Sequence, residues 1–145
     1  MSIIDDACAR IQDLALAVTD EVVKTAPDYV VDDAMGQMPM SNVYLKDGEI
    51  TAMDASGTKW LATLSCDVFF NRTSARQAYK QIHAFTPDFV KRLGGDPTLK
   101  NTVSNIVYPI KFKVTPAQFD GDPSLYMCVA FDIPIKFILL STSTP

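Results

Sequence analysis

The chain has 145 residues, of which 48% are hydrophobic and 21% charged, with a formal net charge of −4 and a single histidine. These values predict one domain over residues 1–145 with a core of its own, and they argue against disorder along most of the chain. No apolar run approaches the roughly 18 residues of a membrane helix, and one histidine excludes a multi-histidine metal site. The acidic start, Asp5-Asp6, does not suit a signal peptide, so we expect no membrane association.

The first predicted element is an amphipathic helix over residues 3–25. Its apolar residues recur at spacings of three and four, and Asp5 and Asp6 suit the positive end of the helix dipole. Residues 29–31 predict a short strand. The methionine-rich residues 35–40 predict a loop, with an adaptable contact surface as the alternative.

Strand signals dominate the next part of the chain. Residues 43–45 and 49–53 predict a β-hairpin around Lys46-Asp47-Gly48, because Asp-Gly favours the positive φ of a tight turn. Residues 54–57 are a second turn signal. Residues 58–70 predict the strongest strand, because the even-numbered residues from position 60 onward are all apolar. Such a strand belongs to an antiparallel or mixed sheet with one face on the core.

A second helix is predicted to begin at Thr73 or Ser74 and to end near Phe85. We expect Pro87 to open a further helical turn, which residues 94–95 close.

Two long strands are predicted over residues 106–114 and 125–139, and residues 140–145 are expected to fray. Pro109 and Pro134 each imply a sheet edge or a bulge, because proline cannot donate a ladder hydrogen bond. The order of elements predicts an α+β fold. We expect a mainly antiparallel or mixed sheet of about five strands, with the N-terminal and central helices packed on one face.

The net charge is divided unevenly along the chain. Residues 1–57 carry three basic and eleven acidic residues, a net of −8, whereas residues 58–145 carry ten basic and six acidic residues, a net of +4. This balance does not suit a general nucleic-acid binder. Two interpretations stay open: the charges solvate their own elements, or acidic and basic surfaces of neighbouring copies meet head to tail.

The three cysteines, Cys8, Cys66 and Cys128, are widely spaced among apolar neighbours. They match neither a disulfide framework nor a zinc site, so we expect free, buried thiols.

Candidate catalytic and ligand-binding residues lack the neighbours that such chemistry requires. We therefore expect a protein that is not an enzyme and that has no cofactor or metal. Two alternatives stay open: an enzyme that uses Asp67 or Asp132 with His83, and a small-ligand-binding domain with a pocket between helices and sheet. The other positions considered are Ser65, Ser74, Gly94-Gly95-Asp96, the pair Asp32-Asp33, and Asp120 with Asp122.

Lys111 and Lys113 alternate with apolar residues and so are predicted to face away from the core. They either protect a sheet edge from aggregation or meet carboxylates of a neighbouring subunit or a passing polyanion. With Asp47 and Glu49 they form the candidate subunit or lumen interface.

The order and length of these elements resemble the tail terminator proteins of long-tailed bacteriophages. The similarity is carried by the helix over residues 3–25, the strand over 60–70 that leads into the helix over 73–85, and the strands over 106–114 and 125–139. Residues 35–40, longer than a simple turn, depart from this layout.

The resemblance implies a virion protein of the tail or neck, assembled in the host cytoplasm. It would form a hexameric ring that caps the tail tube protein, ends tube polymerisation and docks the head-tail connector protein. DNA would pass through such a ring without sequence readout. Another neck, head-completion or baseplate adaptor protein is the alternative within this class.

Overall fold

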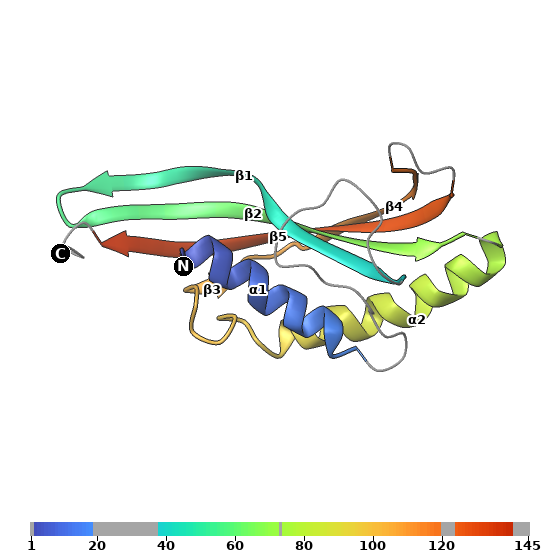
Figure 1. Cartoon of the computed structure of the whole chain (residues 1–145). Coiled ribbons are helices and arrows are strands. Elements are labelled where there is room, and N and C mark those ends of the chain that lie inside the picture. The colour runs from blue at the N-terminus through green and yellow to red at the C-terminus, as the bar shows by residue number, and fades with distance from the viewer. Residues whose placement is uncertain (1, 19–37, 73, 120–123, 141–145) are drawn as a thin grey trace.

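The computed structural model describes residues 2–18, 38–72, 74–119 and 124–140 (Figure 1). It confirms the predicted α+β class, with two helices and one five-stranded sheet. The elements are α1 (Ile3–Leu16), β1 (Met40–Asp54), β2 (Gly57–Asn71), α2 (Ala75–Gly94), β3 (Asn105–Ile106), β4 (Lys111–Ala117) and β5 (Tyr126–Leu140).

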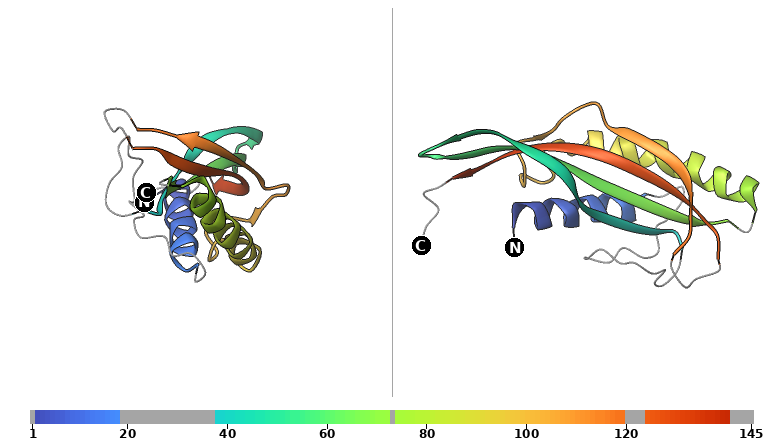
Figure 2. Two further views of the ribbon diagram at one scale, coloured as in Figure 1. Left: turned by 90° about the vertical axis from the view of Figure 1, so that its right-hand side faces the viewer. Right: turned by 90° about the horizontal axis from the view of Figure 1, so that it is seen from above.

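The sheet is antiparallel throughout, in the order β1-β2-β5-β3, and β4 pairs with another stretch of β5. Both helices lie side by side on one face of the sheet, as the end-on view in Figure 2 shows. We call the opposite, helix-free side the open face. β1 and β4 are therefore edge strands of the sheet.

The core lies between the helices and the sheet. The predicted alternation of the strand over residues 58–70 is confirmed in β2, whose even-numbered residues from Ala62 to Phe70 are buried. The odd-numbered residues of β5 from Met127 to Phe137 are buried as well, although Leu125 and Leu139 at the strand ends are exposed. Phe89 of α2 packs edge-to-face on Phe131 of β5, with ring centroids 5.0 Å apart.

Both helices differ in length from their prediction. α1 ends at Leu16, not near residue 25, and the Ala17 N–H donates to the Asp13 carbonyl; residues 19–25 lie outside the described ranges. α2 does not end near Phe85 but continues through Pro87 to Gly94. The predicted cap at Ser74 is confirmed, because its side chain accepts from the Gln77 N–H at 3.2 Å.

The continuation of α2 past Pro87 has a packing explanation. An interior proline costs a helix about 3 kcal/mol. Phe85, Phe89 and Leu93 are spaced four apart and fully buried, and burying each such side chain contributes about 1.5–3 kcal/mol. The two side chains beyond the proline therefore offset its cost.

The predicted hairpin around residues 46–48 is wrong. β1 runs without a turn from Met40 to Asp54, and the hairpin to β2 is made by the second turn signal, residues 54–57. Gly48 allows β1 and β2 to lie close together, because a Cβ there would be 2.9 Å from the Leu61 carbonyl oxygen. At the real turn, the Asp54 carboxylate accepts from the backbone N–H groups of Ser56 and Gly57.

The single strand predicted over residues 106–114 is also wrong, because β3 and β4 are separated by residues 107–110. Pro109 lies in this interruption. Pro134 lies inside the central strand β5, and its carbonyl accepts from the Val107 N–H at 2.8 Å. The position of the missing Pro134 N–H therefore faces the gap between β3 and β4, where no ladder hydrogen bond is needed. This gap meets the requirement for an edge or a bulge that the two prolines implied.

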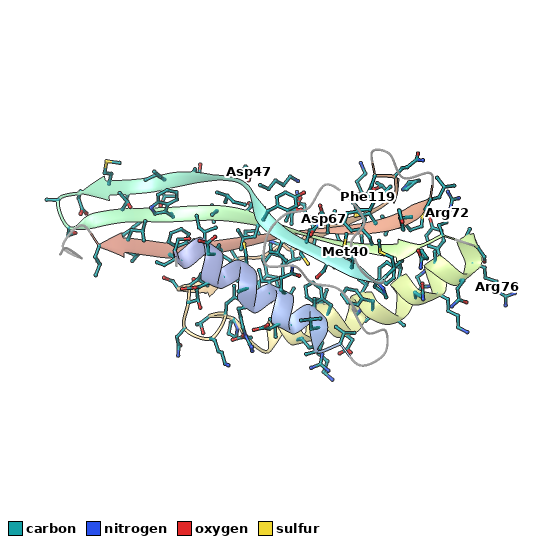
Figure 3. The ribbon with its side chains drawn as sticks, in the orientation of Figure 1. Met40, Asp47, Asp67, Arg72, Arg76 and Phe119 are labelled. Atoms are coloured by element: carbon teal, nitrogen blue, oxygen red, sulfur yellow. The ribbon has the colours of Figure 1, made fainter. Side chains whose placement is uncertain are left out.

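A smaller apolar cluster lies outside the main core, on the open face. Met40, Phe119 and Tyr126 are buried there, with Phe69 packed against them (Figure 3). Met40 thus begins β1 and does not belong to the loop predicted over residues 35–40. The rest of that loop up to residue 37, and the strand predicted over 29–31, lie outside the described ranges.

Candidate assembly interface

The four predicted interface residues lie on one face of the sheet but at opposite edges. Asp47 and Glu49 are on β1, and Lys111 and Lys113 are on β4; all four are exposed. The register pairs Asp47 with Thr63, Glu49 with Leu61, Lys111 with Asp132 and Lys113 with Ala130. Because directly paired residues share a face, and these partners alternate with the buried residues, all four side chains belong to the open face.

The structure does not bring the acidic pair and the basic pair into contact. Three strand spacings separate β1 from β4, which is about 14 Å across the sheet. Along the strand direction, Asp47 is level with Pro134 and Lys111 pairs with Asp132, an offset of two residues. One edge is therefore acidic and the other basic at nearly the same height.

A register shift in β1 sets the direction of these side chains. Leu45 pairs with Leu64 and Asp47 with Thr63, so Lys46 is the additional residue of a bulge. The Lys46 Nζ reaches across β2 to Asp132, at 3.0 Å from Oδ1. The hydrogen bond and charge of Asp132 raise the pKa of Lys46. The bulge thus keeps Leu45 on the helix side while it turns Asp47 to the open face.

The sheet extends beyond the helices as an arm, which we define as residues 50–54 of β1, 57–60 of β2 and 137–140 of β5 (Figures 1 and 2). Its apolar side chains are unusually accessible: Ile50 is 46% exposed and Met53 is 71% exposed. Leu139 on the helix side and Ile138 and Leu140 on the open face are exposed too. Several large apolar side chains exposed in one region of a protein typically mark an interaction site.

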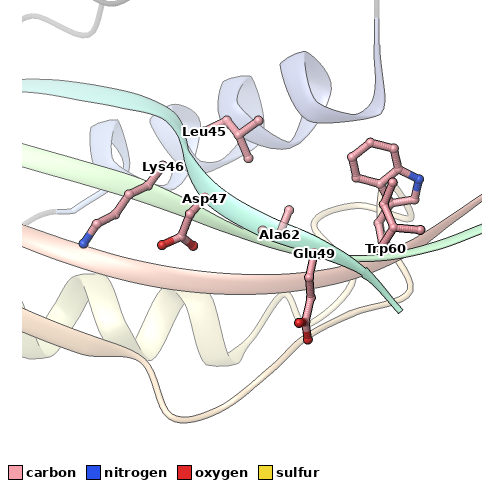
Figure 4. Close-up of a pocket in the computed structure, with 8 residues that line it drawn as sticks. Leu45, Lys46, Asp47, Glu49, Trp60 and Ala62 are labelled. Carbon is pink, nitrogen blue, oxygen red and sulfur yellow. The ribbon is translucent and has the colours of Figure 1, made fainter. Parts of the chain in front are cut away.

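A hollow of about 520 Å³ lies along β1 at the base of the arm (Figure 4). Leu45, Ala62 and Trp60 form its apolar side, and Lys46, Asp47 and Glu49 point the other way in Figure 4. The hollow lies at the sheet edge, not between helices and sheet where a small-ligand pocket was expected. Its lining combines an apolar wall with charged side chains at the sheet edge, which suits a protein side chain.

The structure does not bring His83 to either carboxylate of the enzyme alternative. His83 is exposed on α2, with the Tyr79 ring 6.2 Å away, whereas Asp67 and Asp132 belong to the sheet. Asp67 accepts hydrogen bonds from the Tyr44 hydroxyl at 2.7 Å and the Ser65 hydroxyl at 2.8 Å. Asp132 is bound by Lys46 on the open face.

The remaining candidate residues that the structure describes serve to cap a helix or to join two helices. Ser74 caps α2, Gly95 caps its other end, and Asp96 accepts from the Arg10 Nε at 2.7 Å, which ties α1 to the end of α2. Asp32, Asp33, Asp120 and Asp122 lie outside the described ranges. Among the residues that the structure describes, no group of three or more metal-binding side chains gathers.

The three cysteines are free, as predicted, and two of them are buried as expected. Cys66 and Cys128 are buried and Cys8 is half-buried. Burial raises the pKa of Cys8 to about 11 and that of Cys128 to about 12, with nearby Asp5 and Asp67 respectively adding to the effect. Burial likewise raises the pKa of Cys66.

The arm is a candidate functional feature that the sequence reasoning missed. Its signal was present as apolar residues that continue to the ends of long strands, such as Ile50, Met53 and Leu140. Their strands are 15 residues long, about 50 Å, whereas the 14 residues of α1 cover about 21 Å. These lengths, which the folded structure sets, leave part of the sheet with no helix to cover it.

A comparison with models of known protein families, and another with curated protein sequences, found no match to this chain. Over the part of the chain that the structure describes, no helix has the length and apolar character needed to cross a membrane.

Proposed function

We propose that this chain is a structural virion protein of a long-tailed phage, a tail terminator whose copies form a hexameric ring. The ring caps the tail tube, ends its polymerisation and joins the tail to the head connector. Its role is one of assembly and uses no catalytic residue or cofactor. DNA passes through the ring without sequence readout.

The observation that carries this proposal is the arm. A single copy in water leaves Ile50, Met53 and Leu139 exposed on one side of a strand ribbon that projects past the helices. Burying such side chains is favourable by about 25 cal/mol per Å² of apolar surface, so association with another protein surface stabilises them. An assembly subunit requires this kind of surface.

The charge distribution supports a head-to-tail arrangement over a two-fold dimer. Asp47 and Glu49 at one edge and Lys111 and Lys113 at the other are complementary only when different edges meet. Interfaces between different surfaces of identical subunits generate closed rings when the rotation closes.

The first test is the mass and shape of the purified protein. Light scattering across a salt and concentration series should give a species six times the 16.0 kDa chain mass, and negative-stain images should show rings of six. High salt should shift the equilibrium toward smaller species, because exposed charges are screened within about 10 Å at 0.1 M salt. A monomer at every salt and protein concentration would overturn the proposal.

The second test concerns the cap. Added to polymerising tail tube protein from the same phage, the ring should bind tube ends and stop elongation. The double variant Ile50→Ser and Met53→Ser should lose ring formation, because it removes apolar surface from the arm. Leu16→Ser, at a comparably exposed position at the end of α1, is the matched control and should keep it.

A further inference from the structure

The outer edges of β1 and β4 have compatible strand directions. Each neighbouring pair in the series β1, β2, β5 and β4 is antiparallel, so β1 and β4 run in opposite directions. If a second copy is placed beside the first in the same orientation, β4 of one copy lies antiparallel to β1 of the next. The alternation of the sheet then continues across the boundary, with the helices of both copies on the same side.

The accessible parts of both edges can be delimited. The Gln12 Nε2 donates to the Ser41 carbonyl at 3.1 Å, so α1 occupies the start of the β1 edge. From Leu45 to Asp54 every residue of β1 is exposed. On β4, Lys111 to Lys113 are exposed, and Pro116 lacks the N–H that pairing farther along would require. The free stretches are therefore residues 45–54 of β1 and residues 111–115 of β4.

The two edges are also complementary on both faces. On the open face, Asp47 and Glu49 of β1 would meet Lys111 and Lys113 of β4. On the helix side, Phe112 is 56% exposed and packs only partly on Phe131, with ring centroids 5.9 Å apart. Its partner there would be the apolar wall of the hollow, which Leu45 and Trp60 line.

We propose that residues 111–115 of β4 in one copy pair antiparallel with residues 45–50 of β1 in the next copy. This inference rests on the proposed ring and specifies its interface. Each junction extends the sheet from subunit to subunit, places two carboxylates against two ammonium groups, and seats Phe112 in the hollow beside Trp60. The strands then run parallel to the ring axis, so every arm emerges at one rim, and Arg72 and Arg76 lie toward the other (Figure 3).

Charge reversal tests this pairing. The variant Asp47→Lys with Glu49→Lys has two basic edges, and the variant Lys111→Glu with Lys113→Glu has two acidic edges. Each alone should assemble at least about tenfold more weakly than the wild type, because like charges then meet at every junction. Mixed in equal amounts, the two variants should form an alternating ring, since each basic edge meets an acidic edge. The chain with all four substitutions should assemble by itself.

The controls separate failure of the interface from failure of the ring or the fold. Lys80→Glu with Lys91→Glu, on the exposed surface of α2, lowers the net charge by as much as Lys111→Glu with Lys113→Glu and should leave assembly unchanged. Circular dichroism should show each variant folded, and recovery on mixing requires folded chains. If the wild type forms rings and the single-edge variants do so equally well, the pairing is wrong although the ring stands. If the wild type forms no ring, the proposed function fails first.

Discussion

Trp60 of β2 and Phe137 of β5 stack almost parallel, with ring centroids 5.5 Å apart and 13° between their planes. The pair lies directly across the strands and closes the core where the arm begins. Beyond it, the residues of β1 and β5 are exposed, and Thr58 of β2 between them is half-buried. The stack is therefore the point at which the folded core ends and the proposed assembly surface starts.

Removing this stack should destabilise the fold. For Trp60→Ala we expect a loss of about 2 kcal/mol in the free energy of unfolding, because Trp60 is half-buried and the aromatic pair adds to its area term. Urea unfolding followed by circular dichroism measures this, since Trp60 is the only tryptophan and its fluorescence is lost in the variant. Trp60→Phe keeps a ring on Phe137 and should lose less than about 1 kcal/mol. Equal losses for both variants would contradict a stabilising stack.

The turn at the tip of the arm requires glycine at position 57. Gly57 has φ +152°, and a Cβ there would lie 2.2 Å from the Leu139 carbonyl oxygen. We expect Gly57→Ala to separate the ends of β2 and β5, with faster amide hydrogen exchange at residues 57–60 and 137–140. Gly94→Ala is the control, because its nearest atom would be 3.9 Å away; it should leave exchange in the arm unchanged. Unaltered exchange in the Gly57 variant would show that the tip tolerates a side chain.

The ion pair between α1 and the segment after α2 should make stability depend on pH in the acid range. Burial acts to raise the pKa of Asp96, but the Arg10 side chain and the Lys100 N–H hold it below its usual value. The stabilisation is therefore present above the unfolded-state pKa near 3.8 and lost as the pH falls through the lower folded-state value. Asp96→Asn should lose about 1 kcal/mol at pH 7 and approach the wild type below that range. If the difference in the free energy of unfolding between the variant and the wild type stayed constant down to pH 2, the charge of Asp96 would not be the source of the stabilisation.

The thiols should be slow to react in the folded protein. The thiolate is the reactive form, and a rise in the pKa of Cys8 from 9.0 to about 11 reduces its thiolate fraction about 100-fold. Burial limits Cys66 and Cys128 further. With DTNB at pH 8, we expect little reaction in buffer and three thiols per chain in guanidinium chloride. A fast native thiol would indicate local opening of the sheet.

The sequence determined the elements that depend on local periodicity. The strong alternation of β2 and of β5, the helix cap at Ser74 and the packing of both helices on one sheet face were all predictable. In the strands and helices one face is apolar over many residues, so its burial could be read from the order of side chains, whereas the cap follows from the preference for serine before a helix. The alternation of Lys111 and Lys113 with apolar residues indicated their open-face position for the same reason.

Where elements end was decided by the tertiary structure. Asp47-Gly48 has the composition of a turn, yet pairing with β2 draws it into a continuous strand. Pro87 has the composition of a helix end, yet the burial of Phe89 and Leu93 carries α2 past it. In both places the free energy gained by long-range packing exceeds the free energy lost by overriding the local turn or helix-end preference. A short stretch of sequence indicates only the local preference.

The candidate interface shows the same division. Sequence alone identified an acidic first part, a basic second part and four charged interface candidates, of which Lys111 and Lys113 were predicted to face away from the core. Only the sheet order placed the two pairs at opposite edges of one face, because strand neighbours are chosen by contacts far apart in the chain. The arm also arises only in the tertiary structure, where strands of 15 residues pack against a helix of 14 residues that is less than half as long.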